Sequence, residues 1–150
     1  MRPPKRKDVQ VVIFMGPKGV GRKEHSRRLH NRIGKEKSLL VEAAEVLREQ
    51  NSRHINRQIQ ARELVPDSKV NRAIGRYVER NAKHVVILEG FPRTEEQARF
   101  LSEEGPALLG VKKVFIVDLS PDSKARARVA PVITSLTSAG AQHLAIKPGN

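Results

Sequence analysis

A glycine-rich stretch near the N-terminal end has the residue types and spacing of a phosphate-binding loop. Residues 16–23 read GPKGVGRK and nearly match the pattern G-x-x-x-x-G-K-[ST]. Glycines allow backbone N–H groups to point at phosphate oxygens, and a helix that begins after the loop adds partial positive charge. The pattern therefore predicts phosphate binding at Gly16, Lys18, Gly19, Gly21, Arg22 and Lys23. A plain strand-to-helix turn that requires glycine is the alternative interpretation.

Two features of this loop depart from the pattern. Arg22 stands where the pattern has lysine, and the next residues, Lys23 and Glu24, carry no hydroxyl. In the pattern the lysine reaches the transferred phosphate and a Ser or Thr hydroxyl holds Mg²⁺. Arginine also binds phosphate, but its planar fork is bulkier and differently aimed. The Glu24 carboxylate would either reach the metal ion or repel the phosphate.

The elements around the loop predict an α/β fold. Apolar runs rich in β-branched residues indicate buried strands, and apolar residues spaced three and four apart indicate helices. We expect strands at 9–15, 38–41, 84–88 and 113–119, and helices at 22–33, 42–50, 55–61, 66–81, 94–103 and from 120 onward. This order predicts a parallel sheet of about four strands flanked by helices, with ligands at the carboxyl ends of the strands. Residues 1–8 are expected to form a flexible basic tail, and residues 131–150 an irregular one.

Two further segments resemble the adenylate kinase family. Residues 64–67 read LVPD, and residues 89–98 read EGFPRTEEQA, where the family has L-V-P-D and D-G-F-P-R-T-x-x-Q-A. Together with the glycine-rich loop, this resemblance covers about residues 9–130. It implies a nucleoside monophosphate kinase domain with the P-loop NTPase fold, in which residues 42–81 form a helical part that binds the monophosphate.

The resemblance also implies roles for individual residues. ATP would bind at the glycine-rich loop, Arg22 and Arg93 would be catalytic, and Mg²⁺ would lie near Glu89. The residues implied for AMP are Arg48, Leu64, Val65, Gly90, Arg93 and Gln97. Simpler interpretations stay open: the two arginines could be surface residues, and Gln97 could pair with Thr94 as a helix cap.

Other positions differ from the family. Its S-T-G-D segment is replaced by EAAE at residues 42–45, which places Ala43 at the position of a nucleotide-contacting threonine. The family's G-R-R turn and its arginine-bearing lid after the fourth strand are not found. Lid closure brings cations to the transferring phosphate and excludes water. These differences favour a degenerate relative that is catalytically weak or inactive.

The charge distribution indicates an anionic partner. The chain carries a net charge of +13, and residues 1–83 hold 21 basic against 9 acidic side chains. This basic half is expected to contact an acidic protein surface, such as a microtubule or axoneme, or an RNA backbone, and no membrane. A solvated basic face is the simpler interpretation. Cysteine is absent, which excludes a disulfide scaffold and a thiolate metal site.

Three functions follow from these observations. The first is a structural or regulatory subunit that retains some nucleotide binding, placed in the cytoplasm in a ciliary axoneme or, as a second expectation, in a mitochondrial ribonucleoprotein. The second is an active ATP:AMP phosphotransferase that uses Mg²⁺. The third is a basic nucleic-acid-binding module, although the chain has only one Tyr, four Phe and no Trp for stacking on bases.

Overall fold

The protein folds around a parallel β-sheet of five strands. The computed structural model describes residues 8–50 and 65–145. The strands are β1 (Val9–Met15), β2 (Ser38–Glu42), β3 (Val85–Glu89), β4 (Val111–Asp118) and β5 (Gln142–Ala145), in the order β2-β3-β1-β4-β5. All neighbouring strands pair in parallel, and β1 lies in the centre between β3 and β4. The predicted α/β fold is confirmed.

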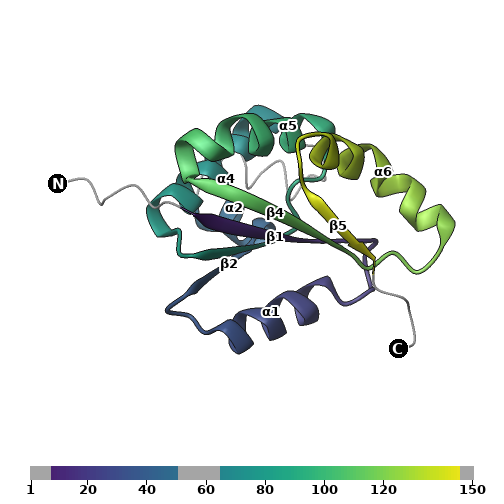
Figure 1. Cartoon of the computed structure of the whole chain (residues 1–150), viewed down its shortest axis with the longest axis horizontal. Helices are drawn as coiled ribbons and strands as arrows, with labels where there is room; N and C mark the ends of the chain where they lie inside the picture. Colours follow the sequence, from purple (N-terminus) through teal and green to yellow (C-terminus); the bar gives the residue numbers. More distant parts are fainter. Residues whose placement is uncertain (1–7, 51–64, 146–150) are drawn as a thin grey trace.

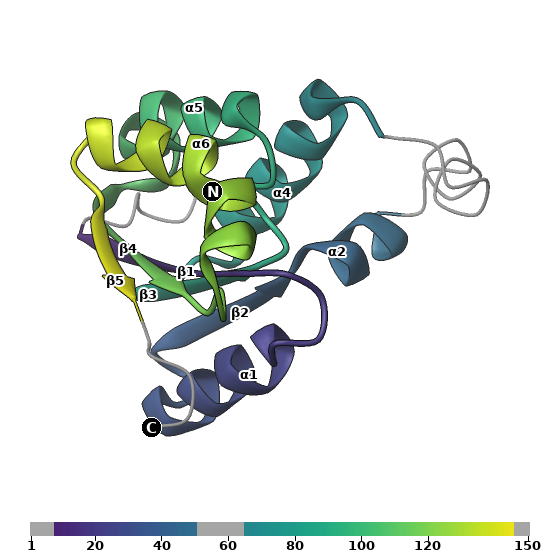
Figure 2. The ribbon, with the colours of Figure 1, turned by 90° about the vertical axis from the view of Figure 1, so that its right-hand side faces the viewer.

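Helices cover both faces of this sheet (Figures 1 and 2). Helix α1 (Arg22–Ile33) lies on one face, and α4 (Asp67–Asn81), α5 (Glu95–Glu104) and α6 (Ser123–Ser138) lie on the other. Helix α2 (Ala43–Glu49) follows β2 directly, and a short π-helical turn, η1 (Gly105–Leu109), joins α5 to β4. The helix expected at 55–61 and residues 1–7 of the expected basic tail lie outside the described residues.

The alternation of side chains along the strands creates two apolar layers. On β1, Val11 and Ile13 belong to the large cluster that includes α4, α5 and α6, whereas Phe14 belongs to a smaller cluster. Leu29 and Ile33 of α1 pack on this smaller cluster. Because helices cover both faces of the sheet, its central strands are apolar on both faces, which explains the continuous apolar runs in the sequence.

The expectation of an irregular tail at residues 131–150 is wrong as far as residue 145. Helix α6 continues through Pro131 to Ser138, and β5 then pairs with β4. Proline removes one helical hydrogen bond, and for this reason the helix was expected to end near Pro131. The next turns bury Val132, Ile133 and Leu136, and this packing holds the helix together beyond the proline.

None of the described helices is long and apolar enough to cross a membrane.

Candidate functional site

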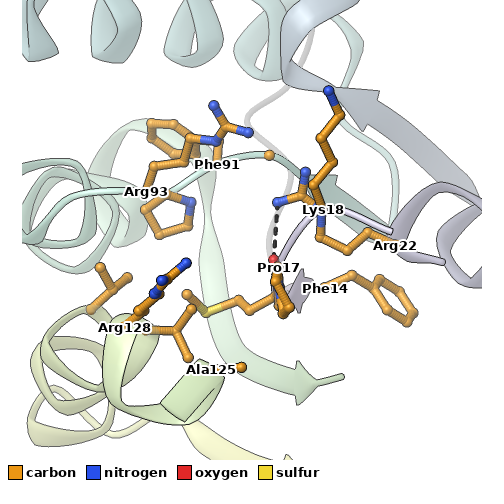
Figure 3. A pocket seen from close by; sticks show the side chains of 14 residues that line it. Phe14, Pro17, Lys18, Arg22, Phe91, Arg93, Ala125 and Arg128 are labelled. Carbon is orange, nitrogen blue, oxygen red and sulfur yellow. Dashed lines mark hydrogen bonds between the residues drawn. The ribbon is translucent and has the colours of Figure 1, made fainter. Parts of the chain in front are cut away.

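The candidate site lies at the carboxyl ends of β1 and β3, which are neighbours in the sheet. The chain leaves β1 into the glycine-rich loop, and it leaves β3 into the segment from Gly90 to Thr94. These two segments and the first half of α6 surround a cavity of about 290 Å³ (Figure 3). This is the edge of an open parallel sheet at which ligands bind.

The backbone of the loop has the conformation that its glycines predict. Gly16 and Gly21 have φ angles of +144° and +87°, which side-chain-bearing residues rarely adopt. A Cβ atom on Gly16 would lie 3.0 Å from the Cγ2 atom of Val20. Gly21 precedes α1, and no side chain caps that helix end. The first N–H groups of α1 therefore donate no hydrogen bond to a capping side chain.

Four cationic side chains line the cavity. They are Lys18, Arg22, Arg93 and Arg128, and no acidic side chain of the described residues lines it with them. Arg93 and Arg128 lie on one side of the cavity, and Lys18 and Arg22 lie on the other (Figure 3). Positive charges gathered around one small cavity repel each other and attract anions, so the arrangement is suited to a phosphate-rich ligand.

Arg22 is held in place by two groups of the protein. Its Nη1 atom donates a hydrogen bond to the carbonyl oxygen of Gly16 at 3.3 Å, and its Nη2 atom lies 3.7 Å from Oε2 of Glu89. Glu89 ends β3 and is only 5% exposed. A buried carboxylate requires a counter-charge, and Arg22 supplies it.

Gln97 is engaged within the protein. Its Oε1 atom accepts a hydrogen bond from the backbone N–H of Arg93 at 2.7 Å, and its Nε2 atom donates to Oδ1 of Asp67 at 2.9 Å. Its own N–H donates to Oγ1 of Thr94, which caps α5. The bond to Thr94 is that of a helix cap, whereas the side-chain amide bonds to Arg93 and Asp67 and not to the N–H of Thr94. The amide oxygen and nitrogen each retain the capacity for one further hydrogen bond, and adenine recognition by Gln97 stays a prediction.

The cavity brings together part of the predicted set. Gly16, Lys18, Arg22, Gly90 and Arg93 line it, whereas Gly19, Gly21, Lys23, Arg48, Val65 and Gln97 do not. The Arg48 side chain is half exposed and pairs with Glu45 on the same helix. Val65 packs against the large apolar cluster. Leu64 lies outside the described residues.

Arg128 lines the cavity but was not predicted as a site residue. Helix α6 begins after Asp122, which caps it by accepting a hydrogen bond from the N–H of Ala125 at 2.8 Å. Ala125, Arg128, Val129 and Val132 line the cavity at helical spacings of three and four. This spacing was present in the sequence, but no motif marks it, and the contact with the glycine-rich loop depends on tertiary packing.

Comparison with known proteins finds relatives of this chain among the adenylate kinases. No protein-family model matches the chain. The chain is 34% identical to the adenylate kinase of Thermus thermophilus over 117 residues, which cover 71% of this chain and 59% of that protein. The adenylate kinases of Rickettsia akari and Thermotoga petrophila are 31% and 29% identical over 60% and 61% of this chain. This chain is related to the adenylate kinases.

The chain spans only part of these relatives. The matched residues amount to 44% of the length of both the Rickettsia and the Thermotoga proteins. After β4 this adenylate kinase relative continues directly into α6, and three residues, 139–141, then lead into β5. In this described part of the chain, no lid is inserted between β4 and β5.

The family implies Mg²⁺, but the residues at the site fit it poorly. The two loop positions after Arg22 carry no hydroxyl, and the Glu89 carboxylate is paired with Arg22. Within residues 8–50 and 65–145, no group of three or more metal-ligating side chains is found. Glu89 as a metal ligand therefore stays a prediction that the ion pair opposes.

Proposed function

We propose that this adenylate kinase relative binds nucleotide phosphates in the cationic cavity and transfers phosphoryl groups slowly or not at all. The observation that carries this proposal is the convergence of Lys18, Arg22, Arg93 and Arg128 on one cavity at the strand ends. In this proposal ATP contacts the glycine-rich loop, and AMP contacts the side formed by Gly90 and Arg93. The protein then acts as a structural or regulatory subunit of a larger assembly.

Two features support slow transfer. Phosphoryl transfer depends on cations that contact the transferring phosphoryl group. One arginine that contacts this group can change the rate of transfer by a factor of about 10³–10⁵. Arg22 is instead held by Gly16 and Glu89. No lid is inserted between β4 and β5 to exclude water or add cations.

An active ATP:AMP phosphotransferase is the alternative. The names of the relatives and the presence of Arg22 and Arg93 at the cavity support it. A coupled assay with ATP, AMP and Mg²⁺ separates the two proposals. Turnover that approaches about 10 s⁻¹, a common value for enzymes, would refute a degenerate protein.

Binding itself is tested by calorimetry with ATP, ADP and AMP. Arg93→Ala is expected to weaken AMP binding at least about tenfold, since it removes a charge-assisted contact. Arg99→Ala is the matched control, because Arg99 lies exposed on α5 and does not line the cavity. Equal affinity of the two variants would place the nucleotide elsewhere.

A second candidate function is contact with an anionic polymer. Exposed cations of the basic half lie on α1 and on α4, which cover opposite faces of the sheet. They include Lys23, Arg28 and Arg32 on α1, and Arg72, Arg76 and Arg80 on α4. The three arginines of α4 are four residues apart, a like-charge spacing that weakens an isolated helix. An RNA backbone or an acidic protein surface would relieve that repulsion, in a ribonucleoprotein or a ciliary axoneme.

RNA binding at two salt concentrations tests this second function. The affinity of wild type for single-stranded RNA should fall with increasing salt, because each phosphate contact releases a counterion. Replacement of Arg72, Arg76 and Arg80 by Gln should reduce both the affinity and its salt dependence. Absence of binding at low salt would exclude the RNA partner, and a parallel titration with polyglutamate would test the acidic protein surface.

A further inference from the structure

The Arg22–Glu89 pair affects whether the cavity can accept a nucleotide that carries a divalent cation. Glu89 is the carboxylate that the family pattern places near the metal ion, and it follows the apolar run of β3. In this chain its charge is compensated by a guanidinium group at 3.7 Å. A divalent cation beside Glu89 would have to approach that guanidinium closely, and the like charges would repel each other.

The other carboxylates at this edge of the sheet are also engaged. Glu42 ends β2 and accepts two hydrogen bonds from Arg27, at 2.9 and 3.1 Å. Asp118 ends β4, accepts the N–H of Ser120 at 2.9 Å, and lies 3.5 Å from Nε2 of His143. Each strand-end carboxylate of β2, β3 and β4 therefore has a partner within the chain. A hard cation would have to displace one of these partners to gain an oxygen ligand.

The loop itself offers no hydroxyl as a replacement ligand. The positions after Arg22 hold Lys23, which is exposed on the first turn of α1, and Glu24. The Oε2 atom of Glu24 lies 3.3 Å from the position of a Cβ built on Gly21. The carboxylate therefore lies close to the residue that precedes α1, in the first turn of the helix, where a negative charge is favourable.

The cavity supplies positive charge without a metal ion. Its lining includes four cationic side chains, and the described residues add no acidic side chain to it. A magnesium ion on a polyphosphate cancels part of the negative charge that these cations would contact, and it covers oxygen atoms that arginine would otherwise bind.

We propose that the cavity selects metal-free polyphosphate over the magnesium complex, with Arg22 in the place of the divalent cation beside Glu89. This inference rests on the proposed nucleotide binding and names the ionic form that is bound. Arg22 then acts as a specificity-determining residue, because its guanidinium both neutralises Glu89 and faces the phosphates.

Calorimetric titration with ATP in excess EDTA and in excess Mg²⁺ tests this inference. We expect wild type to bind ATP about tenfold more weakly in Mg²⁺, the worth of one charge-assisted hydrogen bond. The double variant Arg22→Lys/Lys23→Thr gives the loop the pattern G-x-x-x-x-G-K-[ST] and should bind ATP more tightly in Mg²⁺ than in EDTA. Arg99→Ala should behave as wild type, because Arg99 lies outside the cavity.

A metal-specific readout complements the titration. With Mn²⁺ in place of Mg²⁺, the water proton relaxation rate of a mixture with ADP should rise on addition of the double variant and stay unchanged on addition of wild type. Equal or tighter binding of ATP by wild type in Mg²⁺ would overturn the metal-free preference and leave nucleotide binding intact. Absence of ATP binding in both conditions would overturn the proposed function itself.

Discussion

Removal of the arginine from the Arg22–Glu89 pair should destabilise the whole fold. In the variant Arg22→Ala, the Glu89 carboxylate stays buried at the end of β3 without its counter-charge. A substitution that leaves a buried charge without a partner can lower the free energy of unfolding by several kcal/mol. Most surface substitutions change it by less than about 0.5 kcal/mol.

The geometry of the pair sets the size of the effect. Opposite charges about 4 Å apart attract by about 4 kcal/mol in a medium of effective dielectric constant near 20. The Arg22 side chain is 20% exposed and that of Glu89 is 6% exposed, so water screens the pair in part. We expect Arg22→Ala to lower the free energy of unfolding by about 2–3 kcal/mol, below the full cost of breaking a buried pair. Glu89→Gln should cost about 1 kcal/mol, since Arg22 can still reach water.

Urea denaturation of the two single variants and the double variant measures this coupling. The double variant should lose about as much free energy of unfolding as Arg22→Ala alone. The two single losses would then exceed the double loss by at least about 1 kcal/mol, which is the coupling energy of the pair. Arg128→Ala is the control, because within the described part of the chain Arg128 forms no ion pair within 4.0 Å and its removal leaves no carboxylate unpaired. Additive losses, or a loss below about 0.5 kcal/mol for Arg22→Ala, would refute the reasoning.

Three further predictions concern parts of the fold that hold the site. Leu136→Ala should cost about 2–5 kcal/mol in urea denaturation, because Leu136 is 1% exposed in the core beneath α6, and an unchanged midpoint would mean that this helix does not pack as described. Pro131→Ala should raise the thermal midpoint, by restoring a helical hydrogen bond worth up to about 3 kcal/mol, and a lower midpoint would show that proline is required there. Thr94→Ala should lower the free energy of unfolding by about 1 kcal/mol through loss of the cap of α5, with Thr94→Ser as the control that retains it.

The centre of the sheet was predictable because its strands have a strong local signal. Buried parallel strands have apolar side chains on both faces, and β1, β3 and β4 satisfy this condition. β5 has only four residues, and its ladder contacts a single neighbour. A short edge strand has little apolar sequence to distinguish it from a loop, and its position depends on pairing with β4, which lies far away in the sequence.

The site was predictable where a motif fixes the backbone, and less so where tertiary packing decides. Gly16 and Gly21 adopt positive φ angles because the loop requires them, and the glycines of the sequence pattern predict this conformation. The partner of Arg22 is different, since Glu89 lies 67 residues further along the chain and meets it only when β1 and β3 pair. Arg128 likewise reaches the cavity only because α6 packs beside the ends of β1 and β3, which lie more than 30 residues earlier in the chain.

The most direct test of the account is phosphorus NMR of ATP and AMP mixed with an equal amount of the protein. We expect the phosphate resonances of ATP to shift or broaden, which reports binding at the cationic cavity, while the ADP signal grows at less than about one hundredth of the rate of an ordinary enzyme. Rapid conversion of ATP and AMP into ADP would contradict weak transfer. Sharp, unshifted ATP lines at saturating protein would contradict the nucleotide site itself.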